Sequence, residues 1–249
     1  SDLEDWTVRK DKNKGQISGC EAIKKRVELE GGSASIYEND RQNPGRWILK
    51  DGKGNDSDEI ILFFNWSEIS NNKADGALES GADYLFSLLV TPQNTPLTSN
   101  LLNSDIPFHF IAHSRGNPLL IQLLHRILKY YPDRKINQFT GLDPHPAKPM
   151  NDLNDENQNL SLPGVFGSSK NYPTNQPYLI LPENVLKCDY YYRQAFLYES
   201  LVPNLDFFDF SGIKIIGGNE RQLIDKDLQN GATPIVGLKF AHTAVPEWY

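Results

Sequence analysis

The feature that most constrains the fold is an alternation of apolar runs with leucine-faced helical stretches in the middle of the chain. Apolar runs at residues 60–66, 108–112 and 135–142 predict three strands, the first two of the kind covered on both faces. Residues 75–90 and 116–131 carry apolar side chains at three- and four-residue steps, which predicts two amphipathic helices. The order strand–helix–strand–helix–strand therefore predicts an α/β fold, with a mostly parallel central sheet flanked by helices and joined by right-handed crossovers.

The apolar positions of the two predicted helices follow from this spacing. The first stripe consists of Ala77, Leu78, Ala82, Leu85, Leu88 and Leu89. The second consists of Leu119, Leu120, Leu123, Leu124, Ile127 and Leu128. Pro118 is compatible with the second helix because it falls in the first turn, where its missing N–H has no helical partner.

The rest of the chain has weaker patterns. Further short strands are predicted at 34–37, 46–49, 189–193 and 213–216, and loops at 51–58, 91–105 and 144–186. The length of 249 residues fits one large domain. We predict a single domain over 1–249, with a divergent N-terminal part at 1–58 and a long loop or lid at 144–186.

Charge and composition exclude some classes of partner. The formal net charge of −7 argues against binding to nucleic acid. No apolar stretch is long enough to cross a membrane, and the opening SDLEDWTVRK has no signal segment. The compartment stays open, with secretion slightly favoured over the cytoplasm, and the oligomeric state is unknown. Cys20 and Cys188 allow one disulfide at most, with two thiols as the alternative.

The stretch FHFIAHSRGN (108–117) places a serine between a predicted strand and a predicted helix. Such a strand–turn–helix elbow exposes the serine hydroxyl and aims the first helical amides at a developing oxyanion. Small flanking residues let strand and helix pass closely: Ala112 replaces the usual glycine, and Gly116 is expected to occupy the more crowded position. The alternative is that Ser114 only caps the helix. We interpret Ser114 as a nucleophile because both flanking elements are present.

A carboxylate follows the next predicted strand, at Asp143. Because reactive groups in parallel sheets gather at the carboxyl ends of strands, Asn65, Trp66, Ser114 and Asp143 are expected at one edge. An Asp-Pro pair is also a common start of a turn. Beside an elbow serine, we interpret Asp143 as the acid that orients a catalytic histidine.

Five histidines are candidates for the base that activates the serine. His109 and His125 fall within a predicted strand and helix, which indicates structural roles. His113 adjoins the serine, but its side chain is expected to point away from the hydroxyl. The chain order Ser–Asp–His of α/β-hydrolases favours His242, with His145 in reserve.

Together these stretches resemble a known family. IILFFNWSEISNN (60–72), FHFIAHSRGN and FTGLDPHP (139–146) are similar to the central block of pancreatic-type lipases, members of the α/β-hydrolase superfamily. HSRG, LDPHP, DYYYR (189–193) and the terminal H-x-x-V-x-x-W-Y are more closely similar to a group of bacterial hydrolase-like proteins. The resemblance covers about residues 60–249 and implies an α/β-hydrolase-like fold.

The resemblance also implies a chemistry. It implies a serine esterase or lipase that cleaves small-molecule or lipid esters through an acyl-enzyme, with Asp143 as the triad acid. The alternatives are a peptidase, thioesterase or acyltransferase with the same triad, or a non-catalytic binding module of this fold. The backbone amide of Arg115 is expected to donate to the oxyanion. The family's second donor follows a His-Gly turn that residues 40–58 lack, and KDGKG (50–54) is the nearest candidate.

No cofactor is expected. Some lipases of this type hold calcium in the loop after the triad acid, where this chain has Asp152, Asp155 and Glu156. A solvated acidic loop is favoured over a calcium site, because the fixed ligand spacing of a calcium loop is missing. No lipid-binding second domain is expected after Tyr249. Leu160, Leu162, Val165 and Phe166 are candidates for the acyl-facing side of a lid.

Overall fold

The computed structural model describes part of the chain and divides it into two compact units. One unit consists of 1–72 with 80–106 and the other of 73–79 with 107–249, and each is described by itself. The described residues are 19–55, 57–66, 77–92, 100–144, 180–193 and 215–223. The single domain over 1–249 stays a prediction, and the predicted lid lies mostly outside the described residues.

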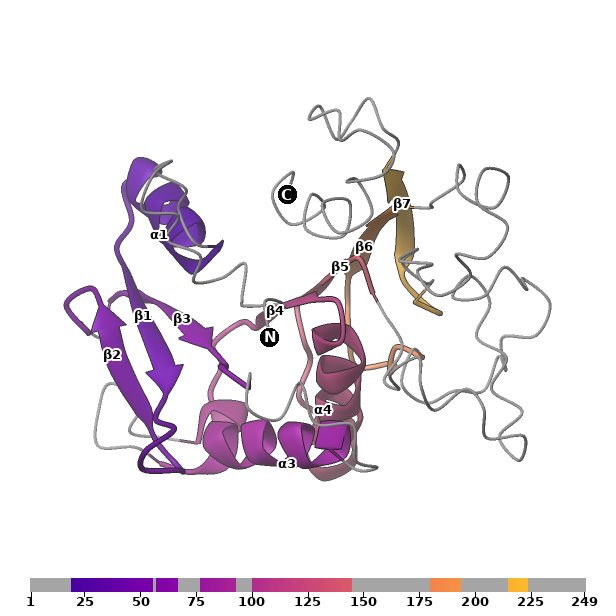
Figure 1. Cartoon of the computed structure of the whole chain (residues 1–249), viewed down its shortest axis with the longest axis horizontal. Coiled ribbons are helices and arrows are strands. Elements are labelled where there is room, and N and C mark those ends of the chain that lie inside the picture. The colour runs from indigo at the N-terminus through magenta and orange to yellow at the C-terminus, as the bar shows by residue number, and fades with distance from the viewer. Residues whose placement is uncertain are drawn as a thin grey trace, which may run out of the picture. The chain divides into compact units, whose positions relative to one another are not determined.

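The first unit contains a three-stranded mixed sheet in the order β2-β1-β3 (Figure 1). β1 (Ala34–Asn39) pairs antiparallel with β2 (Trp47–Asp51) and parallel with β3 (Glu59–Phe63). The strands predicted at 34–37, 46–49 and 60–66 are thus confirmed with shifted ends. The apolar side chains of β3 are half-buried rather than fully buried, and the strand ends before Asn65 and Trp66.

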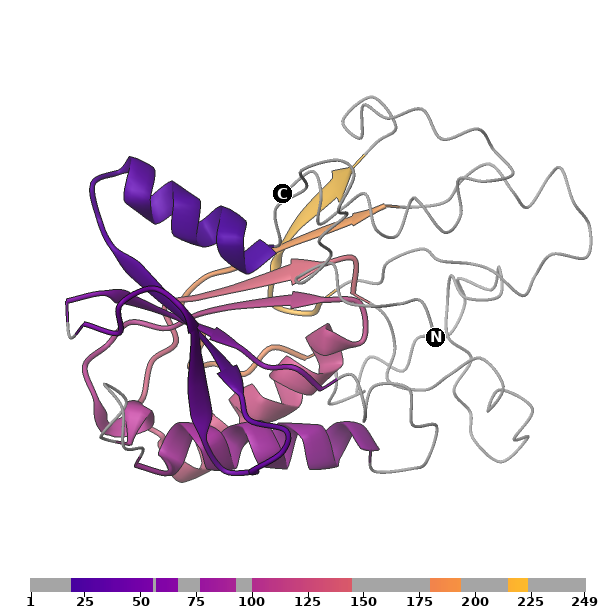
Figure 2. The ribbon, with the colours of Figure 1, turned by 60° about the vertical axis from the view of Figure 1, so that its left-hand side comes forward.

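A helix that the sequence patterns did not indicate, α1 (Gly19–Leu29), lies over this sheet (Figure 2). None of its residues is buried, and its sequence GCEAIKKRVEL is dominated by charged residues rather than by a wide apolar stripe. Gly31, with φ of +85°, ends the helix. Gly32 N–H donates to Val27 O and Gly31 N–H donates to Glu28 O, which is a Schellman motif. The glycine pair is therefore a helix C-cap.

α3 (Ala77–Val90) confirms the predicted stripe in full, since all six of its apolar positions are buried. From Ser80 onward α3 belongs to the first unit and packs on the sheet. Trp47, buried at the start of β2, donates its indole N–H to Leu88 O at 3.3 Å. The rings of Phe64 and Tyr84 lie 5.8 Å apart. These contacts form the core of the first unit.

The hairpin between β1 and β2 is organised by Asp40. Its Oδ1 accepts the N–H groups of Gln42 and Asn43, and its Oδ2 accepts Arg46 Nε at 2.7 Å. The Asn43 N–H first, and then the Arg46 guanidinium, lower the pKa of Asp40 from its usual 3.8 to about 2. The folded state therefore stabilises the ionised carboxylate.

Acid should remove this stabilisation. Because the pKa is lower in the folded than in the unfolded chain, the stabilisation is complete above the usual pKa of 3.8 and is lost as pH falls toward about 2. We expect Asp40→Asn to lower the thermal unfolding midpoint at pH 7 and to converge with wild type as pH falls through about 2. Thermal unfolding at stepped pH measures this, with Asp133→Asn, at an exposed carboxyl, as control. A difference that stays constant with pH would contradict the prediction.

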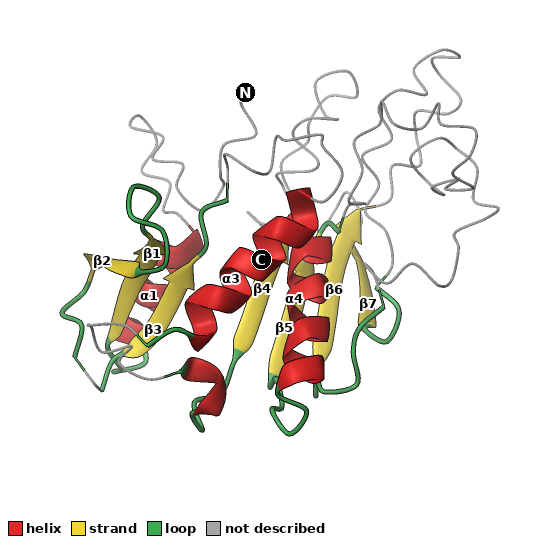
Figure 3. Ribbon diagram, turned by 90° about the horizontal axis from the view of Figure 1, so that it is seen from below, coloured by secondary structure: helices red, strands yellow, loops and turns green. Residues whose placement is uncertain are grey.

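The second unit contains a four-stranded sheet in the order β4-β5-β6-β7 (Figure 3). All three neighbouring pairs are parallel, which together with the helices confirms the α/β class. The strand predicted at 60–66 does not pair in this sheet, because β3 pairs with β1 in the mixed sheet of the first unit. The strands are β4 (His109–His113), β5 (Gln138–Leu142), β6 (Cys188–Arg193) and β7 (Asn219–Leu223).

α4 (Gly116–Tyr130) connects β4 to β5 and lies against this sheet (Figure 3). Five of the six predicted apolar positions are buried, while Leu128 is half-buried. Ile121, outside the predicted stripe, is also fully buried. The buried face is therefore wider than the predicted stripe.

Two predicted segments differ from the structure. Of the strand predicted at 213–216, only residues 215 and 216 lie within the described residues; there Ile216 forms an isolated bridge with Ile180, and the next strand, β7, begins at Asn219. Gly217, with φ of +94°, turns the chain before β7. The loop predicted at 91–105 contains a short 3-10 helix, Leu101–Asn103, whose two leucines are buried.

Both cysteines are thiols in the structure. Cys20 is half-buried in α1 and Cys188 is buried in β6. Burial, with a smaller contribution from the charge of Asp189, raises the pKa of Cys188 to about 12. Because the thiolate is the reactive form, Cys188 is an inert core residue.

Candidate active site

Ser114 lies in a sharp turn between β4 and α4. β4 ends at His113 and α4 begins at Gly116, so Ser114 and Arg115 alone connect them. Ser114 has φ of +53°, a left-handed conformation that is unfavourable for residues other than glycine. Its N–H donates to Leu142 O at 3.0 Å and its carbonyl accepts Asn117 N–H at 3.1 Å. The predicted strand–turn–helix elbow is present.

Asp143 lies in a second strained turn, directly after β5. Its φ is +42°, and among the described residues it shares a positive φ only with Ser114 and with glycines. Its N–H donates to Tyr191 O at 2.7 Å, and the residue is fully buried. A buried carboxylate requires polar or charged partners. The burial of Asp143 therefore argues against the alternative that it only starts a turn at the surface.

The sheet register brings these two residues to one edge. β4 and β5 pair in parallel with His113 opposite Leu142, so Ser114 and Asp143 are the next residues of adjacent strands. Adjacent strands lie about 5 Å apart. The carboxyl edge of the sheet therefore carries a serine and a buried carboxylate side by side. Asn65 and Trp66 belong to the other unit, so their place at this edge stays a prediction.

The small residues beside the elbow have different roles from those expected. A Cβ added at Gly116 would meet only the Cβ of Ala112, at 3.8 Å, an ordinary contact. The expectation that Gly116 occupies the crowded position is therefore wrong. The glycine that the site requires to be bare is Gly141 in β5, where a Cβ would approach Asn117 Oδ1 to 2.7 Å.

Arg115 is the N-cap of α4, with φ of −61°. As the residue after Ser114, it carries its amide at the N-terminal end of the helix, where the helix dipole favours negative charge. Its side chain is half-buried, and burial lowers the pKa of the guanidinium. The charge persists at neutral pH because arginine is protonated in proteins. The position suits an oxyanion donor, although this role stays a prediction.

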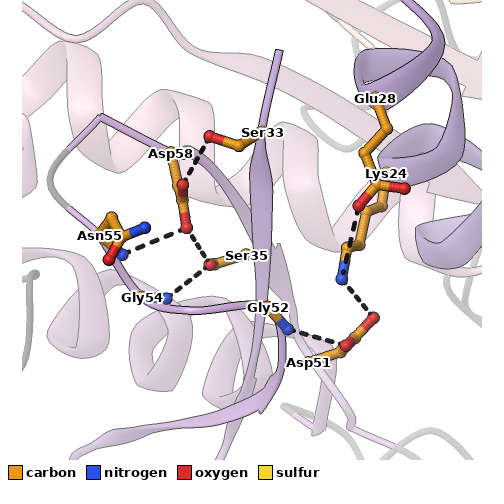
Figure 4. A network of polar contacts seen from close by, with 9 residues as sticks. All are labelled: Lys24, Glu28, Ser33, Ser35, Asp51, Gly52, Gly54, Asn55 and Asp58. Atoms are coloured by element: carbon orange, nitrogen blue, oxygen red, sulfur yellow. Dashed lines mark hydrogen bonds and ion pairs between the residues drawn. The ribbon is translucent and has the colours of Figure 1, made fainter. Parts of the chain in front are cut away.

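KDGKG, the nearest candidate for the second oxyanion donor, has two amides that are already engaged, those of Gly52 and Gly54. Their N–H groups donate to Asp51 Oδ1 and Ser35 Oγ, both at 2.8 Å (Figure 4). The loop also leads into the amino end of β3, where Glu59 pairs with Ala34 at the start of β1. It therefore lies opposite the carboxyl edge of its sheet.

A carboxylate keeps this loop in place. Asp58 accepts hydrogen bonds from Ser33 Oγ, Ser35 Oγ and the N–H of Asn55 (Figure 4). The two serine hydroxyls lower the pKa of Asp58. At Gly52, φ is +97° and an added Cβ would collide with Ser35 Oγ, so only glycine fits. The network is a structural support for the loop.

The histidines divide into two groups. His242 and His145, the two candidates for the base, lie outside the described residues, so the base stays a prediction. His109 Nε2 lies 2.8 Å from Thr140 Oγ1, and His125 Nε2 lies 2.9 Å from Ile180 O. Both make the contacts of structural residues. His113 is half-buried as the last residue of β4.

The acidic loop considered for calcium, with Asp152, Asp155 and Glu156, also lies outside the described residues. Within the described ranges, no three His, Cys, Asp or Glu side chains form a group that could hold a metal ion. Over the same part of the chain, no helix has both the length and the apolarity needed to cross a bilayer.

No protein-family model matches the chain, and no curated protein matches it significantly. Among solved structures it is similar to a suggested cell surface hydrolase from Lactobacillus plantarum, at 14% sequence identity and a TM-score of 0.37. The match covers 68% of this chain and 58% of that chain, so it spans less than two thirds of that protein. A likeness this weak establishes neither a shared fold nor a shared activity.

The class that the structure itself establishes is an α/β protein with a four-stranded parallel sheet. Two strained turns lie at the carboxyl edge of that sheet, one holding Ser114 and the other Asp143.

Proposed function

We propose that this chain is a serine hydrolase of the α/β-hydrolase type that cleaves carboxylic esters. The observation that carries the proposal is that Ser114 and Asp143 follow adjacent parallel strands, both with left-handed backbone conformations. Strained non-glycine residues persist only where the surrounding structure holds them, and they gather at functional sites. His242 completes the proposed triad as the base.

The reaction follows from these roles. His242 removes the proton from Ser114 Oγ as that oxygen attacks the ester carbonyl carbon, giving a tetrahedral oxyanion. The oxyanion accepts a hydrogen bond from the Arg115 amide at the helix N-terminus. Collapse breaks the bond to the alcohol, which takes the proton from His242. Water then attacks the acyl-enzyme by the same steps and releases the acid.

Asp143 acts on the base. A buried carboxylate that accepts the imidazole N–H fixes the tautomer of the histidine and stabilises the imidazolium that forms. Asp143 is fully buried, and its backbone is fixed by the bond to Tyr191 O. A rigid, water-excluded position is what this role requires.

We expect Asp143→Asn to lower kcat by about 10⁴-fold, because an amide at this position favours the wrong tautomer of the histidine. Steady-state kinetics on a p-nitrophenyl ester measure the loss. Asp189→Asn is the matched control, because Asp189 is a buried carboxylate of β6 that pairs with Lys187 away from the elbow. Equal kinetic losses in both variants would contradict the role of Asp143.

The proposed substrate is a small-molecule or lipid ester, with residues 144–186 as a lid over the acyl group. A peptidase, thioesterase or acyltransferase would use the same triad. The amides of Gly52 and Gly54 are engaged within their own loop, which leaves Arg115 as the one proposed oxyanion donor. Loss of one donor typically lowers kcat by about 10²–10³-fold, so we expect a slow esterase.

A panel of p-nitrophenyl esters of increasing acyl length tests the proposal on the full chain. We expect a burst of p-nitrophenol equal to the enzyme concentration, followed by slower turnover, because p-nitrophenol is a good leaving group and hydrolysis of the acyl-enzyme is then the slower step. The acyl length with the highest kcat/KM identifies the acyl preference. No hydrolysis of any ester above the rate without enzyme would favour the non-catalytic binding module.

A further inference from the structure

Asn117, the second residue of α4, contacts both turns of the candidate site. Its side-chain amide nitrogen Nδ2 donates to Ser114 O at 3.0 Å and to Leu142 O at 3.2 Å. Leu142 is the residue before Asp143. The side chain is fully buried. One amide group therefore bridges the backbone carbonyl of Ser114 and the carbonyl that precedes Asp143.

The orientation of this amide is fixed by its surroundings. Carbonyl oxygens only accept hydrogen bonds, so the nitrogen must face Ser114 O and Leu142 O. The reversed amide would place Oδ1 against both oxygens. In the observed orientation Oδ1 is buried and has no hydrogen-bond partner among the described residues. An acceptor left in this way is unfavourable, which indicates that the two donated bonds decide the orientation.

Gly141 leaves the space that Asn117 occupies. A Cβ at Gly141 would lie 2.7 Å from Asn117 Oδ1, 2.8 Å from Ile215 Cδ1 and 3.1 Å from Tyr190 Cβ. No side chain fits there without displacing the amide. The glycine of the G-L-D-P turn and the asparagine after H-S-R-G thus pack directly against each other.

We infer that Asn117 is a positioning residue that holds the Ser114 elbow and the Asp143 turn in a fixed relation. The inference rests on the proposed function, and Asn117 acts through these two turns rather than on the substrate. Ser114 and Asp143 have strained φ angles. Such a backbone conformation relaxes unless the surrounding hydrogen bonds hold it. Because misplacement by about 1 Å is enough to lower rates by about 10²-fold, a bond to each turn is important for catalysis.

The test compares Asn117→Leu with Leu124→Ala in the full chain. Leucine has a similar size but donates no hydrogen bond. Leu124 is a fully buried α4 residue whose side chain has no hydrogen-bonding group, so its truncation is the control for a loss of stability alone. We expect Asn117→Leu to lower kcat by about 10- to 100-fold with KM within about threefold of wild type. Leu124→Ala should keep the wild-type kcat below its unfolding temperature.

Amide hydrogen exchange gives a second readout that does not depend on activity. The amides of Ser114 and Asp143 are bonded to Leu142 O and Tyr191 O. We expect Asn117→Leu to speed exchange at both amides relative to the rest of the sheet, and Leu124→Ala to leave their relative protection unchanged.

The outcomes are distinct. Lower kcat together with faster exchange at both turns supports the inference. An active Asn117→Leu with wild-type kcat would overturn it and leave the proposed function standing, even if exchange changed. A wild-type chain that hydrolyses no ester would remove the proposed function and this inference with it.

Discussion

Replacing Ser114 by alanine is expected to lower kcat for p-nitrophenyl ester hydrolysis by about 10⁶-fold, the effect of removing the nucleophile of a serine triad. The physical reason is that Ser114 Oγ is the atom on which the proposed acyl-enzyme forms, and alanine has no such oxygen. Alanine and serine are similarly disfavoured at a φ of +53°, so the fold should be preserved. Steady-state kinetics and thermal unfolding, measured on the same samples, check both statements.

Ser87→Ala is the control for this variant. Ser87 lies in α3, and its hydroxyl donates to Tyr84 O at 2.7 Å, so it is a structural serine. It should keep the wild-type kcat. Ester hydrolysis by Ser114→Ala within about tenfold of wild type would contradict the assignment of the nucleophile.

The second large effect concerns the base. His242→Ala is expected to lower kcat by about 10⁶-fold, similar to the loss of the nucleophile, because serine and histidine act as a unit. His145→Ala should retain most of the activity. The pH dependence of kcat/KM should lose its limb near the histidine pKa only in His242→Ala. The opposite pattern, with activity lost in His145→Ala alone, would contradict this assignment and identify His145 as the base.

The elements that the sequence predicted well are those with a strong local period. The stripe in α3 has six apolar residues at helical spacing, and all of them are buried. The parallel order of β4 and β5 followed from the helix between them, because parallel neighbours need a crossover. The elbow was predictable for the same reason, since Ser114 lies between a clear strand and a clear helix.

The missed features depend on contacts between distant residues. α1 has no buried residue, and its side chains form ion pairs such as Arg26 with Glu30 at 2.6 Å. Charged pairs of this kind leave no apolar periodicity in the sequence. β7 consists of NERQL, a polar stretch that becomes a strand by pairing with β6. Tertiary pairing thus outweighed local preference.

Asn117 and Gly141 illustrate this limit within the candidate site. In the sequence, Asn117 is a polar residue in the first turn of a helix, and Gly141 is part of a turn. Only the register of β4 and β5 shows that the asparagine amide reaches Leu142 O and that the glycine leaves room for it. The same holds for KDGKG, whose Gly52 and Gly54 amides are engaged with Asp51 and Ser35.

The central claim, that Ser114 is an activated nucleophile, is tested most directly by reaction of the full chain with a fluorophosphonate followed by peptide mapping. An activated serine oxygen displaces fluoride and keeps the phosphonyl group, whereas ordinary serines do not react. We predict one adduct, on the peptide that contains Ser114, which is absent in Ser114→Ala and present in Ser87→Ala. No adduct, or an adduct on another residue that persists in Ser114→Ala, would contradict the claim.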